Sequence, residues 1–91
     1  MRKRSVAVLE EIPNVGPSIS ADLRRIGIAR PAQLPGQDPY ALYARLCAAT
    51  GAHQDPCVLD VFIAAVRYME GGPARPWWYY SATRKRTLAG R

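Results

Sequence analysis

Apolar residues recur at helical spacing along four stretches of this chain. In the second stretch, Ile19, Leu23 and Ile26 repeat at steps of four and three residues, which places them on one buried helix face. The fourth stretch is apolar on nearly every side, which is typical of the buried centre of a small domain. The pattern predicts helices over about 5–12, 17–26, 39–50 and 56–70.

Proline, asparagine and glycine separate the first two stretches. Pro13 disfavours helical geometry in the residue before it, whereas Asn14 and Gly16 tolerate the positive φ that a tight turn requires. Pro17 suits the first position of a helix, where its missing N–H would have no partner. The sequence therefore predicts a helix, a hairpin and a second helix within about twenty residues.

The two later helices have matching boundaries. Asp38 and Asp55 are good N-caps, and a proline follows each of them at the first helical position. Gly51 ends one helix, and a Gly-Gly-Pro run ends the other. Between the two helix pairs, residues 28–37 form a connector that permits at most one helical turn, at about 31–34.

Residues 12–17 and 23–28 read Ile-Pro-Asn-Val-Gly-Pro and Leu-Arg-Arg-Ile-Gly-Ile, and they resemble the helix-hairpin-helix DNA-binding motif. In that family the hairpin usually carries glycine, a hydrophobic residue and glycine, and Asn14 stands here in place of the first glycine. Further segments extend the match: Gln-Asp-Pro-Tyr at 37–40, Asp-Pro-Cys-Val-Leu-Asp-Val-Phe at 55–62 and Pro-Trp-Trp at 76–78. With them, the chain resembles the small bacterial "pathogenicity locus" family of single-domain helix-hairpin-helix proteins.

This resemblance implies a fold and a class of ligand, but no reaction. We expect an all-α, compact domain of four to five helices, in which two packed helical hairpins form a doubled helix-hairpin-helix similar to a SAM domain. Residues 1–74 form this domain. Residues 75–91 form an aromatic and then basic C-terminal segment that packs on the domain or trails from it. That segment is expected to be irregular, and its last eight or so residues are expected to be mobile.

The net charge of +6 is concentrated at the two ends of the chain. Residues 1–4 contribute three positive charges and residues 75–91 contribute five, whereas residues 5–74 hold five arginines against seven acids, a net charge of −2. Basic tails attract phosphate backbones without sequence preference. Alternatively, they are solvated ends that keep the protein soluble.

The hairpin is the first candidate binding site. After Gly16 the chain enters a helix whose first N–H groups lack internal partners and carry partial positive charge, so they suit a phosphate oxygen. The helix-hairpin-helix family often has a lysine just after the hairpin, where this chain has Ser18. The alternative is that the motif is only a corner between two helices. The candidate DNA-binding residues are Asn14, Val15, Gly16, Pro17, Ser18, Ile19, Arg24 and Arg25.

The C-terminal segment is the second candidate. The aromatic run 77–80 and the basic run 84–86 combine the parts of a platform on which single-stranded bases stack. The alternative is that the tryptophans pack the end of the chain over the helical core, since aromatic side chains supply a large buried area. The candidate secondary nucleic-acid contacts are Trp77, Trp78, Arg84, Lys85 and Arg86.

The cysteines and the single histidine do not form a recognisable metal site. Cys47, His53 and Cys57 match no standard zinc spacing, so no metal and no cofactor are expected. Cys57 takes the second position of its helix, where a lowered thiol pKa is expected. Asp55 is interpreted as a helix cap and Asp60 as a charge on a helix face.

No enzyme signature is present, and no catalytic residue is proposed. The chain has one histidine, no glycine-rich nucleotide loop and no carboxylate pair with a partner base. The longest apolar run, 61–66, is about a third of the ~20 residues that a membrane-spanning helix needs, so no membrane contact is expected. Two cysteines without an export signal indicate the cytoplasm.

We therefore expect a small, non-sequence-specific DNA-binding protein that contacts the phosphate backbone through the hairpin after Pro13 and serves DNA repair or uptake. The alternative is a protein–protein interaction module of the same fold without physiological DNA binding. The net charge of −2 over residues 5–74 favours this alternative. DNA is the expected partner, and the sequence identifies no protein partner.

Overall fold

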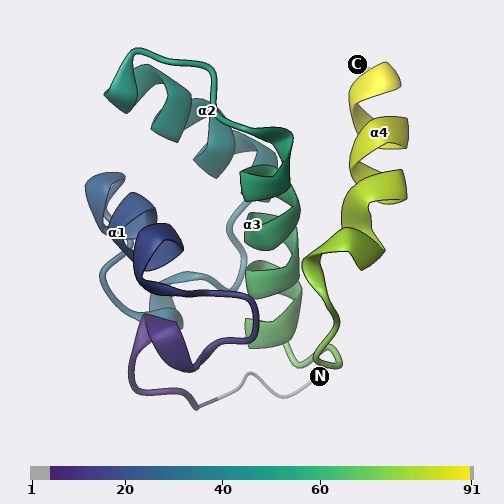
Figure 1. The fold of residues 1–91 in the computed structure, drawn as a ribbon. Helices are drawn as coiled ribbons and strands as arrows, with labels where there is room; N and C mark the ends of the chain where they lie inside the picture. Colours follow the sequence, from purple (N-terminus) through teal and green to yellow (C-terminus); the bar gives the residue numbers. More distant parts are fainter. Residues whose placement is uncertain (1–4, 91) are drawn as a thin grey trace.

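Helix α3 (Pro56–Met69) occupies the middle of the molecule, and the other elements pack around it (Figure 1). The structure is a computed structural model that describes residues 5–90, and over that range it is all-α without any strand. Before α3 come the 3-10 turn η1 (Leu9–Glu11), α1 (Pro17–Arg25), the 3-10 turn η2 (Pro31–Gln33) and α2 (Pro39–Thr50). After it come the 3-10 turn η3 (Trp77–Tyr80) and α4 (Ser81–Ala89). None of the described helices is both long and apolar enough to cross a membrane.

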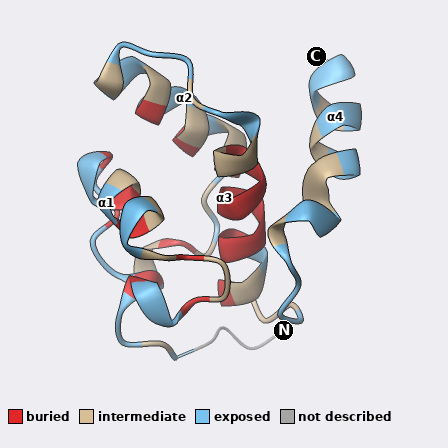
Figure 2. Cartoon of the chain, in the orientation of Figure 1, coloured by how far each residue is buried: buried red, intermediate tan, exposed pale blue. Residues whose placement is uncertain are grey.

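Helix α3 is buried on almost every side, as its sequence predicts (Figure 2). Nine of its 14 residues are buried, and Phe62 and Val66 are completely covered. The same hydrophobic core includes Leu9, Leu23, Leu34, Leu42 and Leu46 from the elements that precede α3. Those elements lie on one flank of α3 in Figure 1, and the C-terminal segment lies on the other.

The predicted caps of the two long helices are confirmed. Asp38 Oδ1 accepts a hydrogen bond from the Tyr40 N–H at 2.9 Å, and Asp55 Oδ1 accepts one from the Cys57 N–H at 2.8 Å. Gly51 ends α2 in the left-handed conformation at φ 66°, which suits a residue without a Cβ. Local capping chemistry therefore sets the ends of α2 and the start of α3.

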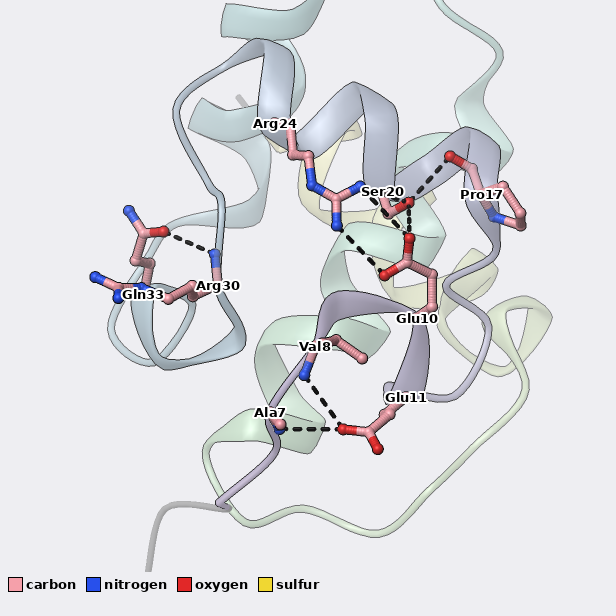
Figure 3. Close-up of polar contacts among 9 residues, drawn as sticks. All are labelled: Ala7, Val8, Glu10, Glu11, Pro17, Ser20, Arg24, Arg30 and Gln33. Atoms are coloured by element: carbon pink, nitrogen blue, oxygen red, sulfur yellow. Dashed lines mark hydrogen bonds and ion pairs between the residues drawn. The ribbon is translucent and has the colours of Figure 1, made fainter.

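The prediction of a first α-helix over 5–12 is wrong, because only the three residues of η1 are helical there. Val8 is extended at φ −130° and ψ 152°, and the Glu11 carboxylate accepts hydrogen bonds from the N–H groups of Ala7 and Val8 at 3.1 and 3.2 Å (Figure 3). A turn that begins at Val8 has only three residues before Ile12, and Pro13 disfavours helical geometry at Ile12. The helix predicted before the hairpin is therefore a single 3-10 turn.

The connector forms one helical turn, as predicted. Its turn η2 is held by the Gln33 side chain, whose Oε1 accepts hydrogen bonds from the N–H groups of Ala29 at 2.7 Å and of Arg30 at 2.8 Å. Figure 3 shows the second of these bonds. The Gln33 Nε2 group also donates to the Gly27 carbonyl at 3.0 Å. One side chain therefore ties the turn to the end of α1.

The C-terminal segment is more ordered than the sequence predicts. Where we expected an irregular and then mobile segment, η3 is followed directly by α4, which continues to Ala89. Trp77 packs against the hydrophobic core, and α4 runs beside α3 (Figure 1). The basic residues 2–4 and Arg91 lie outside the described residues.

Asp60 explains why α4 is held in place. We interpreted Asp60 as a charge on a helix face, but the structure buries it completely inside the molecule. Its carboxylate accepts hydrogen bonds from Ser81 Oγ at 2.6 Å and from Arg84 Nε and Nη2 at 2.9 and 3.2 Å. The bond to Asp60 raises the pKa of Arg84 further above its ordinary value. A buried charge with a matched partner thus joins α3 to α4.

Replacing Asp60 by alanine leaves the Arg84 guanidinium against the core without its partner. Breaking a buried ion pair from one side costs about 3–5 kcal/mol, so we expect the free energy of unfolding to fall by that order in urea melts. The control Lys85→Ala removes an exposed cation from the same helix and should change the same quantity by less than about 0.5 kcal/mol. A D60A protein as stable as the control would show that this pair does not hold α4.

Candidate nucleic-acid interface

The hairpin turns between Ile12 and the start of α1. Asn14 adopts φ 74° and is the non-glycine residue with positive φ among the described residues, as expected for a tight turn. Gly16 is the N-cap of α1, and its carbonyl accepts the Ser20 N–H at 3.0 Å. The predicted start of the second helix at Pro17 is therefore confirmed.

Three backbone N–H groups are free at this helix start. Within residues 5–90, nothing accepts a hydrogen bond from the N–H of Gly16, Ser18 or Ile19. A Cβ added at Gly16 would meet no atom within 4 Å, so the space beside Gly16 is open. Because the dipole of α1 adds partial positive charge here, the site suits an anionic oxygen.

The exposed side of α1 carries two residues predicted to contact DNA. Ser18 and Arg25 are both exposed, and seven residues of helix place them on the same side, about 10 Å apart along the axis. Nothing in the described part of the chain binds the Arg25 guanidinium. Asp22, half-buried, lies on this side as well and contributes a negative charge.

Arg24, the other candidate arginine, is engaged within the protein (Figure 3). Its Nη2 lies 3.4 Å from Glu10 Oε1, and Ser20 Oγ donates a hydrogen bond to Glu10 Oε2 at 2.9 Å. The Ser20 bond is the largest of the contacts that lower the pKa of Glu10, and Arg24 contributes less. Ser20 is completely buried, and the sequence analysis gave it no role. Arg24 therefore fixes η1 to α1, with about half of its side chain still exposed.

Three other candidates also have structural roles. The Val15 side chain is buried in the core, and the Ile19 side chain is partly buried against the core, so both side chains serve packing. The Asn14 Nδ2 group donates to the Arg75 carbonyl at 2.7 Å, and Oδ1 accepts from the Trp77 N–H at 3.2 Å. The Asn14 side chain thus joins the hairpin to the C-terminal segment. Gly16, Pro17, Ser18 and Arg25 remain exposed or half-buried at the surface.

The two tryptophans have different environments. Trp77 is half-buried and packs against the core, whereas 63% of Trp78 is exposed. Tyr79 is 49% exposed, and the Arg75 guanidinium lies 4.2 Å from the centroid of its ring. The packing interpretation therefore applies to Trp77 but not to Trp78.

The candidate cations of the segment also differ. Arg84 is engaged with the buried Asp60, and only 15% of its side chain is exposed. Lys85 and Arg86 are exposed on α4, and Arg86 Nη2 makes a long contact of 3.5 Å with Thr83 Oγ1. Lys85 and Arg86 are therefore the two members of the basic run available to a ligand.

The cysteines are free thiols, and no cluster of metal-ligating residues occurs in the described part of the chain. Cys57 was expected to have a lowered pKa, but its pKa is raised. The hydrogen bond between the thiol and Asp55 is the main cause, and partial burial and the Asp55 charge act in the same direction. The carboxylate that caps α3 therefore disfavours the thiolate of Cys57.

Residues 2–86 match the family model described as pathogenicity locus, so the chain belongs to that family. It is also 51% identical over 82 residues to the mitomycin resistance protein McrB of Streptomyces lavendulae, an alignment that covers 90% of this chain and 78% of that protein. No solved structure matches the chain. The family membership expected from the sequence motifs is confirmed.

Replacing Asn14 by glycine tests the bridge from the hairpin to residues 75–77. Glycine keeps the positive φ but removes both side-chain hydrogen bonds, so we expect a loss of about 1–3 kcal/mol in the free energy of unfolding and a red shift of the Trp77 emission. Asn14→Ala also lacks both bonds, and its free energy of unfolding should be lower than that of N14G by about 1 kcal/mol, because alanine disfavours positive φ. If N14G equals the wild type in urea melts, the bridge contributes nothing.

Replacing Asp55 by asparagine tests the electrostatics at Cys57. Asparagine is an equally good N-cap, so α3 keeps its start while the neighbouring charge is lost. The pKa of Cys57 should then fall, which enlarges the thiolate fraction at pH 7–8 and speeds alkylation by iodoacetamide. Peptide mass spectrometry separates Cys57 from Cys47, which serves as the internal reference. An unchanged Cys57 rate would contradict this assignment.

Proposed function

We propose that this protein binds the phosphate backbone of DNA, without reading its sequence, through the hairpin that follows Pro13. The observation that supports this most directly is the group of three N–H donors on Gly16, Ser18 and Ile19, which have no acceptor among the described residues, beside open space at Gly16. Backbone donors at a helix start bind phosphate oxygens well. Arg25 supplies a cation farther along the same side of the helix.

The chemistry of these donors fits positioning rather than base recognition. Main-chain N–H groups, a serine hydroxyl and one arginine all suit phosphate oxygens, and such contacts carry no sequence information. The proposal keeps the helix-hairpin-helix interpretation, with η1 in place of the first helix. It also places the protein in the cytoplasm, since free thiols fit a reducing compartment.

The name of the relative from S. lavendulae suggests a cellular context. That protein is named for resistance to mitomycin. We propose that any resistance conferred by this chain depends on the same hairpin. A sensitive host expressing the wild-type chain would then lose its protection when Gly16 is replaced.

The competing function is an interaction module for proteins, because a carboxylate or a phosphorylated side chain also fits three N–H donors. The net charge of −2 over residues 5–74 favours it. Against it, the carboxylate of Glu10, which accepts a hydrogen bond from Ser20 of α1, is paired with Arg24, and this pairing reduces its repulsion of a phosphate. A binding assay with DNA alone distinguishes the two functions, because only the first predicts that the protein binds DNA without a protein partner.

Replacing Gly16 by aspartate puts a carboxylate into the group of N–H donors. We expect duplex affinity to fall by roughly 10- to 150-fold, which corresponds to one charge-assisted hydrogen-bonding contact of about 1.5–3 kcal/mol. The helical circular dichroism signal should stay the same, because an added Cβ has room and φ is negative at −97°. Fluorescence anisotropy with a generic duplex at two salt concentrations measures the affinity.

The matched control is Ala41→Asp, which adds the same charge at an exposed position in the first turn of α2. It should change the affinity only slightly. Arg25→Gln should weaken binding and reduce the slope of log K against log salt by about 0.9. Equal affinities for G16D and A41D would contradict the hairpin proposal, and no duplex binding by the wild type would favour the protein-interaction module.

A further inference from the structure

The C-terminal segment presents two different sides. Half-buried residues recur at 77, 80–81, 84 and 87, which is the side that packs toward α3. Exposed residues occur at 78–79, 82–83, 85–86 and 88–90, and among them 78–79, 82, 85–86 and 89 recur at steps of three to four. Because α4 begins directly where η3 ends, these exposed positions form one continuous strip.

The exposed strip combines open aromatic rings with positive charge. We call Arg75, Trp78, Tyr79, Lys85 and Arg86 the aromatic–basic strip. Ala82 lies between the rings and the two basic side chains, and its small side chain leaves the Trp78 ring accessible. Helical rise places Trp78 about 10–12 Å from Lys85 along the segment.

No acidic side chain balances this charge locally. Residues 71–90 contain no aspartate or glutamate. Asp60 of α3 is buried and already paired with Arg84 on the opposite side of α4, and the N-cap carboxylate of Asp55 also interacts electrostatically with Arg84. The strip therefore offers three cations, from Arg75, Lys85 and Arg86, to an anionic ligand.

We propose that the aromatic–basic strip binds unpaired nucleotides of a single-stranded nucleic acid. An unpaired base has a free π face that stacks on an aromatic ring, and its phosphates pair with nearby cations. Trp78 is the stacking ring, and Lys85 and Arg86 bind phosphates at the adjacent positions of the strand. A duplex does not fit this chemistry, because its bases are already stacked on one another.

The structure fixes the strip in advance of binding. Trp77, directly beside the stacking ring, packs into the core, and Asp60 holds Arg84 and Ser81 of α4. The Arg75 guanidinium over the ring of Tyr79 restrains that side chain as well. Little order therefore has to be gained when a strand binds, which favours affinity.

The strip lies close to the hairpin. Asn14 Oδ1 accepts the Trp77 N–H at 3.2 Å, Gly16 follows Asn14 by two residues, and Trp78 follows Trp77 by one. The two backbones are therefore at most about 20 Å apart at Gly16 and Trp78. A nucleic acid held at one site has its neighbouring nucleotides within reach of the other. The strip's own binding does not depend on the hairpin.

Two single-tryptophan variants test the proposal, since the chain has two tryptophans. Trp77→Phe leaves Trp78 as the reporter, and we expect its fluorescence to be quenched by oligo(dT) and by oligo(rU), which compare DNA with RNA. Trp78→Phe leaves the packed Trp77, whose emission should hardly change. Anionic phospholipid vesicles and a blunt duplex serve as the alternative probes.

Affinities measured by anisotropy provide the second readout. Trp78→Ala should weaken oligo(dT) binding by about 5- to 150-fold, the loss of one stacked base. Leu88→Ala removes a different exposed apolar side chain, which lies in α4, and should leave the affinity within about twofold. Lys85→Gln and Arg86→Gln should each lower the salt slope by about 0.7.

The outcomes separate this proposal from the hairpin proposal. Gly16→Asp should keep strand binding, and Trp78→Ala should keep duplex binding. If W78A binds oligo(dT) with unchanged affinity, the strip is not a stacking site. The same conclusion follows if W78A loses affinity for duplex and for single-stranded DNA equally. Quenching of the W77F protein by vesicles but not by oligonucleotides overturns it in favour of a membrane surface.

Discussion

The structure depends on the burial of α3 on almost every side. A helix that is apolar on nearly every side must be covered from every direction, and a chain of 91 residues has few elements with which to do this. The elements before α3 cover one flank and the C-terminal segment covers the other (Figure 1). The buried Asp60 charge in the second turn of this helix requires a partner, and Arg84 supplies it. The burial of α3 thus determines where the C-terminal segment must lie.

The parts of the fold that local chemistry decides could be predicted from the sequence. Caps at Asp38 and Asp55 and the one-turn connector follow from residues within four positions of each other. The role of Asp60 could not be predicted in this way, because its partner Arg84 is 24 residues away. In a helical pattern, a lone acid among apolar residues looks the same whether it faces water or a distant arginine. The helix α4 depends on the contact between Asp60 and Arg84, so the sequence did not predict this helix either.

The error at the first helix has a different physical cause. Val6, Leu9 and Ile12 are spaced at helical steps of three, but Val8 is extended and Pro13 disfavours helical geometry at Ile12, so only the three residues of η1 are helical. Leu9 and Ile12 are buried as the pattern requires. The sequence therefore identified the core positions correctly and the type of helix incorrectly.

Asn14 shows why the candidate site was only partly predictable. Where the helix-hairpin-helix motif usually has glycine, asparagine also reaches a φ of 74°, and its amide bonds to Arg75 and Trp77. The departure from the motif is thus explained by a contact 61 residues away. The sequence located the turn, but only the structure shows that this side chain faces the C-terminal segment and leaves binding to the backbone of Gly16 and its neighbours.

Most of the acids in residues 5–74 have partners within the protein, so the net charge of −2 over these residues does not describe the charge around the hairpin. Of the seven acids, Glu10, Asp60 and Glu70 pair with arginines, Asp38 and Asp55 cap helices, and Glu11 binds backbone N–H groups. Asp22 is then the acid that no described group binds, and it lies on the Arg25 side of α1. Since salt screens charges beyond about 8–10 Å, the hairpin responds to Asp22, Arg25 and the free N–H groups rather than to the total charge.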